Sequence, residues 1–472
     1  MPDAVVVGAG PNGLAAAIEL ARAGRSVLVL ERAGVVGGGT RTAELTLPGF
    51  RHDVCSAIHP LAAGSPFLRS LALHRFGLEL LEPPVQAAHP LDDGSAVAVH
   101  RSVDQTAAGL GIDAAAYASL IGPLAREWDA LAEIVLGPPR LPRHPALAAR
   151  FGLSGLQPAD VLARRVFGGE RARALLAGMA AHSIQPLSAP GTAAFGLVLL
   201  ALAHATGWPV ARGGAAAIAS ALRACLEALG GERETGREVR SLRDLPPARA
   251  VLFDLTPRQL LSICGPGDLP SSYRRALARF RYGPGAFKLD YALSGPVPWQ
   301  AAECRAAGTV HLGGTLAEIS ASEAAVAAGR HPERPYVLVA QPAVIDPSRA
   351  PGGGHTLWAY CHVPNGSSAA MTAAIEAQIE RFAPGFADLV LARAARGPAQ
   401  LEADNPNYVG GDINAGAATL RQTLARPVVR LNPYATPNRA LFVCSASTPP
   451  GGGVHGMCGY HAARAALRTV LR

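Results

Sequence analysis

A glycine-rich turn near the N-terminus constrains the fold of this 472-residue chain more than any other feature. Gly8, Gly10 and Gly13 have the spacing G-x-G-x-x-G, and Glu31 follows about twenty residues later. An apolar run at 4–7 precedes the turn, a helix is expected over 14–23, and a second apolar run follows at 26–30. Nearly continuous apolar runs are typical of parallel strands that are buried on both faces. The segment is therefore predicted to form a β-α-β unit of the Rossmann type that binds a dinucleotide.

Each residue of this motif has its own physical role. Gly8 permits the tight turn, Gly10 lets the backbone approach the pyrophosphate, and Gly13 lets the helix lie against the strand. Free N–H groups and the helix dipole then favour the phosphates. Glu31 is placed to accept hydrogen bonds from the ribose hydroxyls of the adenosine half. The alternative is a turn that merely packs, but the flanking strands, the helix and the acid argue against it.

Composition excludes several classes of protein. With 49% apolar and 17% charged residues the chain is globular, and its length favours two intertwined domains over one core. The net charge of +8 comes from scattered arginines without a basic block, so no nucleic-acid partner is expected. The seven cysteines never form C-x-x-C, so neither a metal site nor a redox-active dithiol is predicted.

The apolar segments of the chain predict its cellular location. An apolar strand that begins by Ala4 leaves no room for a signal peptide, and no apolar run is long enough to span a bilayer. We therefore expect a cytoplasmic protein. The most apolar stretch, 193–203, is interpreted as a buried helix, with a membrane-dipping element as the alternative. Peripheral contact with a membrane stays open, because positive charge accompanies an apolar chain.

The segment that follows Glu31 points to the kind of dinucleotide. The stretch "GVVGGGTRT" at 34–42 resembles the G-G-x-x-R/S extension of flavoproteins of the glutathione-reductase and amine-oxidase type. The resemblance implies FAD, with the backbone and a basic side chain of the extension at its phosphates. The residues so assigned are Arg32, Gly38, Gly39, Arg41 and Thr42. For Arg41 the alternative is an ordinary surface arginine.

The C-terminal part extends the resemblance. "LFVCSASTPPGGGVHGMCGYHAARAAL" at 441–467 resembles the end of phytoene desaturase-like FAD-dependent oxidoreductases. "NPNYVGGDINAGAATLRQTLARPV" at 405–428 is more similar to the group called pyridine nucleotide-disulphide oxidoreductase domain-containing protein 2. The resemblance implies that Gly452, Gly453 and Val454 bring backbone against the flavin, and that Val239 presents backbone to the adenine.

Three residues are candidates for catalysis near the flavin. His455 replaces the proline usual in the desaturases and is the candidate proton acceptor, with a structural histidine as the alternative. Lys288 is the only lysine of the chain and shares a strand face with Asp290. It is interpreted as a buried amine with a lowered pKa, with a surface ion pair to Asp290 as the alternative. His59 is a weaker candidate, as is His182, since each is more often a core histidine.

Together these features predict an α/β protein with a Rossmann-like FAD-binding domain and an interleaved α+β substrate domain. The FAD-binding domain is assigned to 1–75, 210–265 and 425–472, and the substrate domain to 76–209 and 266–424. Family resemblance implies dehydrogenation or desaturation of a hydrophobic, isoprenoid- or polyketide-like small molecule. No second strand-bound G-x-G-x-x-G is found, so oxygen, a quinone or another carrier is the expected electron acceptor. A flavin-dependent double-bond isomerase and a non-catalytic binding protein on the same scaffold are the alternatives.

Overall fold

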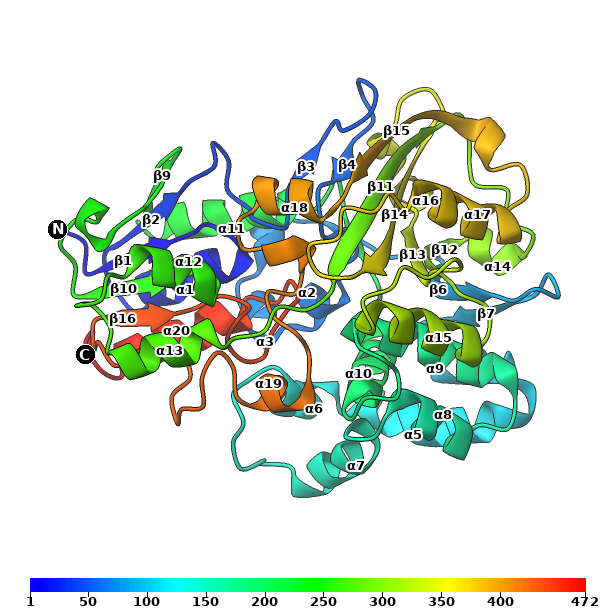
Figure 1. Ribbon diagram of the computed structural model, residues 1–472, viewed down its shortest axis with the longest axis horizontal. Coiled ribbons are helices and arrows are strands. Elements are labelled where there is room, and N and C mark those ends of the chain that lie inside the picture. Colours follow the sequence, from blue (N-terminus) through cyan, green and yellow to red (C-terminus); the bar gives the residue numbers. More distant parts are fainter.

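The first of two main sheets contains five parallel strands, drawn from segments that lie far apart in the sequence. The computed structural model describes residues 1–472. The strand order in this sheet is β16-β10-β1-β2-β9. Their bounds are Leu441–Val443 (β16), Ala250–Phe253 (β10), Ala4–Val7 (β1), Val27–Glu31 (β2) and Glu232–Thr235 (β9). Both chain termini lie beside this sheet (Figure 1).

Alternate residues of the central strand enter cores on opposite faces of the sheet. Ala4 and Val6 pack in the large core that also contains α1, α11 and α20, whereas Val5 and Val7 pack with α12 and α13. Both faces are thus covered, which explains why the strand is apolar without interruption. The helices are α1 (Pro11–Arg22), α11 (Ala216–Ala228), α12 (Pro257–Ile263), α13 (Ser271–Ala278) and α20 (Met457–Leu467).

The β-α-β unit has the predicted form, with shifted boundaries. Helix α1 begins at Pro11, three residues before the expected start. Proline is favoured at the first position of a helix, because the N–H group that it lacks would have no partner within the helix there. Helix α20 runs over Met457–Leu467, directly after the C-terminal glycine turn. Val239 lies beyond the end of β9, in a segment without regular structure.

The second sheet is mixed and belongs to the other half of the molecule (Figure 1). Its seven strands have the order β15-β11-β14-β13-β12-β6-β7, and only β12 and β6 run parallel. The strands are β6 (Val85–Pro90), β7 (Ala96–Val99), β11 (Gly285–Leu293), β12 (Ala307–Leu312), β13 (Val337–Ala340), β14 (His355–Val363) and β15 (Val390–Arg396). The α/β fold with an interleaved α+β part is therefore confirmed, while the numbered domain boundaries stay a prediction.

A helical layer lies beside the second sheet. Its most apolar member, α10 (Thr192–Ala205), packs against α5, α7 and α9, so the interpretation of 193–203 as a buried helix is confirmed. None of the helices combines the length and the apolar character needed to cross a membrane. The other helices here are α4 (Val103–Ala108), α5 (Ala114–Arg126), α6 (Trp128–Val135), α7 (Pro145–Gly155), α8 (Ala159–Val166) and α9 (Glu170–Ala180).

Four short strands and eight further α-helices complete the fold. The short strands are β3 (Thr42–Ala43), β4 (His52–Asp53), β5 (Leu80–Leu81) and β8 (Val210–Ala211). The remaining helices are α2 (Pro60–Gly64), α3 (Pro66–Arg69), α14 (Ala302–Arg305), α15 (Leu316–Ala327), α16 (Pro342–Ile345), α17 (Thr372–Phe382), α18 (Pro398–Asp404) and α19 (Leu420–Leu424).

Candidate functional site

A long cavity of about 600 Å³ runs from the first sheet to the second. Gly8, Glu31, Asp254 and Ser445 line it, and each lies at or just beyond the carboxyl end of a parallel strand. Ligands of open α/β sheets bind at this edge. The volume is within the range of roughly 300–1,000 Å³ that is usual for small-molecule sites.

The glycine turn forms one wall of this first cavity and has no room for side chains. Gly8 has a φ of +100°, which favours glycine. A Cβ on Gly10 would lie 2.6 Å from the Asp254 Oδ2 atom, and a Cβ on Gly13 would lie 2.0 Å from the Gly8 carbonyl oxygen. Gly13 is therefore a packing residue that does not line the cavity, whereas Gly8 and Gly10 expose backbone to it. Helix α1 begins directly after Gly10, so its free N–H groups lie at the same place.

Glu31 marks one end of the cavity. Its Oε2 accepts a hydrogen bond from the Ala9 N–H group at 2.7 Å and its Oε1 accepts one from Ala33 at 2.8 Å. Each carboxylate oxygen can accept more than one such bond, so the group can still take ribose hydroxyls. Arg32 and Val239 also line the cavity, and the Arg237 N–H group donates to the Glu31 carbonyl, which brings the Val239 segment to this end.

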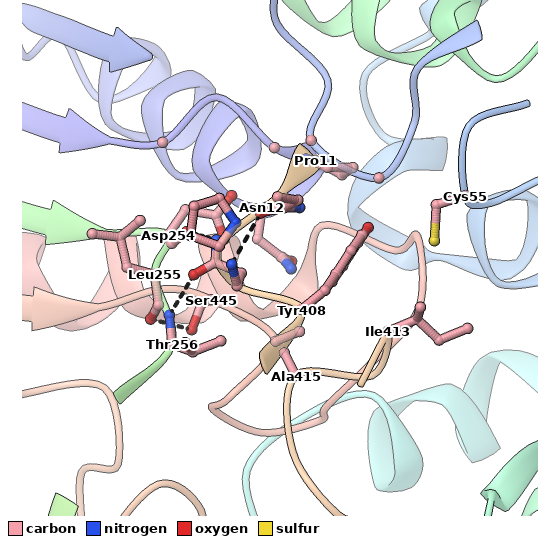
Figure 2. A pocket seen from close by; sticks show the side chains of 18 of the residues that line it. Pro11, Asn12, Cys55, Asp254, Leu255, Thr256, Tyr408, Ile413, Ala415 and Ser445 are labelled. Atoms are coloured by element: carbon pink, nitrogen blue, oxygen red, sulfur yellow. Dashed lines mark hydrogen bonds between the residues drawn. The ribbon is translucent and has the colours of Figure 1, made fainter. Parts of the chain in front are cut away.

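Asp254 is a cavity residue that the sequence analysis missed. Its Oδ2 accepts a hydrogen bond from the Gly13 N–H group at 3.0 Å, and burial raises the pKa of this carboxyl group to about 7. Figure 2 shows Asp254 close to Pro11 and Asn12. Tyr408 lies between this group and Cys55. A signal was available, because "VLFD" at 251–254 repeats the pattern of an apolar strand that ends in an acid, as in "VLVLE".

Some residues of the predicted extension 34–42 line the cavity, and Thr42 stabilises the surrounding structure instead. Gly38, Gly39 and Arg41 line the cavity, and Arg41 Nε donates to the Gly38 carbonyl oxygen at 2.9 Å. Thr42 does not line it. Its hydroxyl donates to Asp53 Oδ1 at 2.9 Å and accepts from the Ala216 N–H group at 3.0 Å, so Thr42 joins β3 to the start of α11.

The other end of the cavity lies against the second sheet. Trp358 and Tyr360 of β14 form part of its wall. Gly452, Gly453 and Val454 line it from the C-terminal turn. A Cβ on Gly453 would lie 2.5 Å from the Leu61 Cδ1 atom, so this turn, like the first, exposes backbone.

A second cavity of about 560 Å³ meets the first one here. It is lined by parts of α7 and α10 and by the segments 133–144 and 414–426. Four residues line both cavities, and they define what we call the junction: His182, Asn414, Gly452 and Gly453.

His182 is the one ionisable side chain of the junction, and it received little weight in the sequence analysis. It lies in the short 3₁₀ helix 181–183 directly after α9. Its Nε2 is 3.0 Å from the His311 Nε2 atom, so one ring donates to the other. Burial, followed by the charge of His362, lowers the pKa of His182 to about 3, which keeps the ring neutral.

His455 lines only the second cavity, and both of its ring nitrogens are occupied. Its Nδ1 accepts a hydrogen bond from the Met457 N–H group at 3.0 Å, and its Nε2 lies 3.2 Å from the Gly451 carbonyl oxygen, to which it donates. Burial lowers the pKa of His455 to about 4. In this arrangement the ring holds the glycine turn closed and has no free lone pair.

Lys288 and His59 line neither cavity. The Lys288 Nζ atom is 2.5 Å from both Asp290 carboxylate oxygens in a buried pair, and burial lowers the pKa of this amine to about 8. It also lies 5.4 Å from the centre of the Trp358 ring, one side chain away from the first cavity. Burial lowers the pKa of His59 to about 4, and its Nε2 has no hydrogen-bond partner.

Known proteins resemble this chain along nearly its whole length. Residues 6–71 match the family described as NAD(P)-binding Rossmann-like domain. Pyridine nucleotide-disulfide oxidoreductase domain-containing protein 2 of Mus musculus is 28% identical, over 99% of this chain and 94% of that protein. Phytoene dehydrogenase of Streptomyces griseus is 28% identical over 76% of this chain and 73% of its own.

Solved structures share the fold. A putrescine oxidase bound to putrescine is similar with a TM-score of 0.62, covering 98% of both chains at 18% sequence identity. The same architecture thus extends over almost all of both molecules.

Proposed function

We propose, from the confirmed resemblance of this chain to the phytoene desaturase-like oxidoreductases, that it binds FAD in the first cavity and dehydrogenates a hydrophobic molecule held in the second. The observation that carries this proposal is the junction. At His182, Asn414, Gly452 and Gly453 the dinucleotide-sized cavity meets a second one of similar volume. A cofactor in one cavity and a substrate in the other would therefore touch at this point.

The residues of the first cavity suit FAD. Glu31 offers carboxylate oxygens to the ribose, Gly8 and Gly10 offer backbone to the pyrophosphate, and Arg41 offers a positive charge. Gly452 and Gly453 leave backbone free at the other end. When bound, FAD would accept a hydride from carbon, which is chemistry that no side chain supplies.

The second hydrogen of a dehydrogenation leaves as a proton, and we assign its acceptance to His182. The ring lies at the junction, and its one hydrogen bond within the protein is the one to His311. His455 stays a second candidate, although proton acceptance there would first require loss of the bond from Met457. For Lys288 and His59 we propose indirect roles, through Trp358 and through the start of α2 respectively.

A hydrophobic substrate suits the walls of the second cavity. Phe151 of α7 and Phe195 and Val198 of α10 line it. Leu141 lies between the lining residues Arg140 and Pro142 and is 94% exposed, and Leu153 follows the lining residue Gly152 and is 77% exposed. Large exposed apolar side chains beside an apolar cavity support the prediction of peripheral contact with a membrane, from which such a substrate would enter.

The test uses whatever molecule the purified protein carries. We expect extraction and mass analysis to identify an apolar compound that bleaches the flavin when added back without oxygen, with a product two hydrogen atoms lighter. Turnover to an isomer of unchanged mass with no electron acceptor present would instead support a double-bond isomerase. A protein that holds such a compound but no flavin would support a non-catalytic scaffold.

A further inference from the structure

The charged groups of the second cavity are nearly all basic. Its only acid is Glu133, whose carboxylate already pairs with Arg140 at 3.4 Å and with Arg143 at 3.7 Å. These three residues belong to the segment 133–144 that lines the cavity. Arg426 lines the cavity as well, and its Nη1 atom is 2.5 Å from where a Cβ on Gly451 would lie, one residue before the junction residue Gly452.

Arg426 is buried and lacks a counter-ion. Only 3% of this residue is exposed. Its Nη2 donates to the Ala415 carbonyl oxygen at 3.2 Å and to that of Gly416 at 3.4 Å, while Nε has no partner. A guanidinium group has five N–H donors, so the two bonds leave most of its hydrogen-bonding capacity unused.

Asp412 is the carboxylate whose charge acts on Arg426, but its oxygens are occupied by backbone N–H groups. Asp412 accepts hydrogen bonds from the N–H groups of Gly283 at 2.7 Å, Asn414 at 2.9 Å and Gly416 at 2.7 Å. It attracts the Arg426 charge from a distance and forms no ion pair with it. Since arginine does not lose its proton in proteins, the cavity contains a positive charge that the fold does not neutralise.

The rest of the wall is mostly apolar, so an occupant that matches this cavity must combine two properties. An apolar body suits Phe151, Phe195 and Val198, and one anionic group suits Arg426. A carboxylate is the natural partner, because its two oxygens fit the planar guanidinium group. A fully apolar hydrocarbon would leave the buried guanidinium group without an anionic partner.

We propose that the second cavity takes an amphipathic carboxylate, with the carboxylate on Arg426 and the chain along α7 and α10. The proposal rests on the proposed function in one respect, namely that this cavity holds the substrate. It narrows the substrate from hydrophobic molecules in general to hydrophobic acids. The carbon to be oxidised would lie close to the acid group, because Arg426 and the junction lie side by side.

The test is calorimetric titration of the FAD-loaded protein with dodecanoate and with 1-dodecanol, which share a chain length and differ in charge. We expect dodecanoate to bind at least about tenfold more tightly, as for a hydrogen bond to a charged group. Arg426→Gln should abolish this preference and Arg426→Lys should retain part of it. Arg164→Gln on the exposed face of α8 is the matched control, since Arg164 lines neither cavity, and it should keep the preference.

Two results would overturn the proposal. One is a wild-type protein that fails to bind dodecanoate or binds both probes equally, a result that does not depend on the folding of any variant. The other is an Arg426→Gln protein that keeps the preference. The heat of binding requires no electron transfer, so flavin bleaching is measured separately to distinguish the two proposals. If an uncharged substrate bleaches the flavin and the protein shows no preference for a carboxylate, only the carboxylate proposal is refuted.

Discussion

Asp254 brings a carboxyl group to the place where the diphosphate of a dinucleotide would lie. Its pKa is raised to about 7, mainly by burial and further by the charge of Glu31. Because the folded-state pKa is raised, the carboxyl group is neutral below about pH 7 and becomes an anion above it. Only the neutral form avoids repulsion with phosphate.

We therefore predict that FAD affinity falls as pH rises through 7, by about tenfold between pH 6 and pH 8. Asp254→Asn keeps the shape and the neutral state, so its FAD affinity should not change over this range. Equilibrium titration of the FAD-free protein at several pH values measures both. A pH-independent wild-type affinity would mean that Asp254 does not face the phosphates.

Rapid-mixing kinetics distinguishes the half-buried junction residue His182 from the buried His455. We expect His182→Ala to retain FAD and to slow flavin reduction by substrate about 10²–10⁴-fold, as for loss of a proton acceptor. His455→Ala removes the bonds to Met457 and Gly451, and its effect on the same rate tests the role predicted for it from the sequence. If His455→Ala slows reduction while His182→Ala does not, the proton goes to His455.

Residues within one local motif could be predicted from the sequence, whereas residues joined by tertiary contact could not. Gly8, Gly10 and Glu31 lie within one β-α-β unit, where spacing alone fixes their geometry. His182 and Asn414 come from distant segments, and only the packing of the helical layer against the C-terminal turn brings them together.

Helix α10 illustrates the same limit for a whole element. An apolar helix packs equally well in a protein core or in a lipid bilayer, so its composition does not decide between them. In the structure most of its side chains are buried against neighbouring helices, while Phe195 and Val198 remain partly exposed and line the second cavity. The helix is thus both part of the core and a wall of the proposed substrate site.

Filling the cavity from this helix should separate substrate binding from cofactor binding. We predict that Val198→Trp leaves FAD content unchanged and weakens binding of a hydrophobic ligand about tenfold or more, because the indole ring occupies the space that the ligand needs. Val161→Trp on the exposed face of α8 is the control, since Val161 lines neither cavity. Ligand titration with thermal unfolding checks both variants, and unimpaired binding in a stable Val198→Trp protein would mean that the ligand lies elsewhere.

The molecule as a whole has one parallel sheet of the dinucleotide-binding kind, and its other large sheet is mixed. All seven cysteines are buried and unpaired. A reductase that takes electrons from a nicotinamide would need a second mononucleotide fold to bring it to the flavin. We therefore predict that NADH and NADPH are poor reductants, and that oxygen, a quinone or another carrier reoxidises the flavin.

Anaerobic mixing of the oxidised protein with each nicotinamide checks this prediction. We expect the flavin to stay oxidised over minutes. Full bleaching within seconds would reveal a nicotinamide site. Electrons would then enter from NADH or NADPH, as the description of the matching family, NAD(P)-binding Rossmann-like domain, suggests.

Cofactor release by heat, followed by chromatographic identification, tests the central claim most directly, with wild type and Gly10→Val compared side by side. The account predicts a yellow wild-type protein that releases about one FAD per chain. Gly10→Val should retain little, since a Cβ at that position would lie 2.6 Å from the Asp254 carboxylate and would project from the turn that receives the pyrophosphate. A colourless wild-type protein, or Gly10→Val with wild-type flavin content, would contradict it.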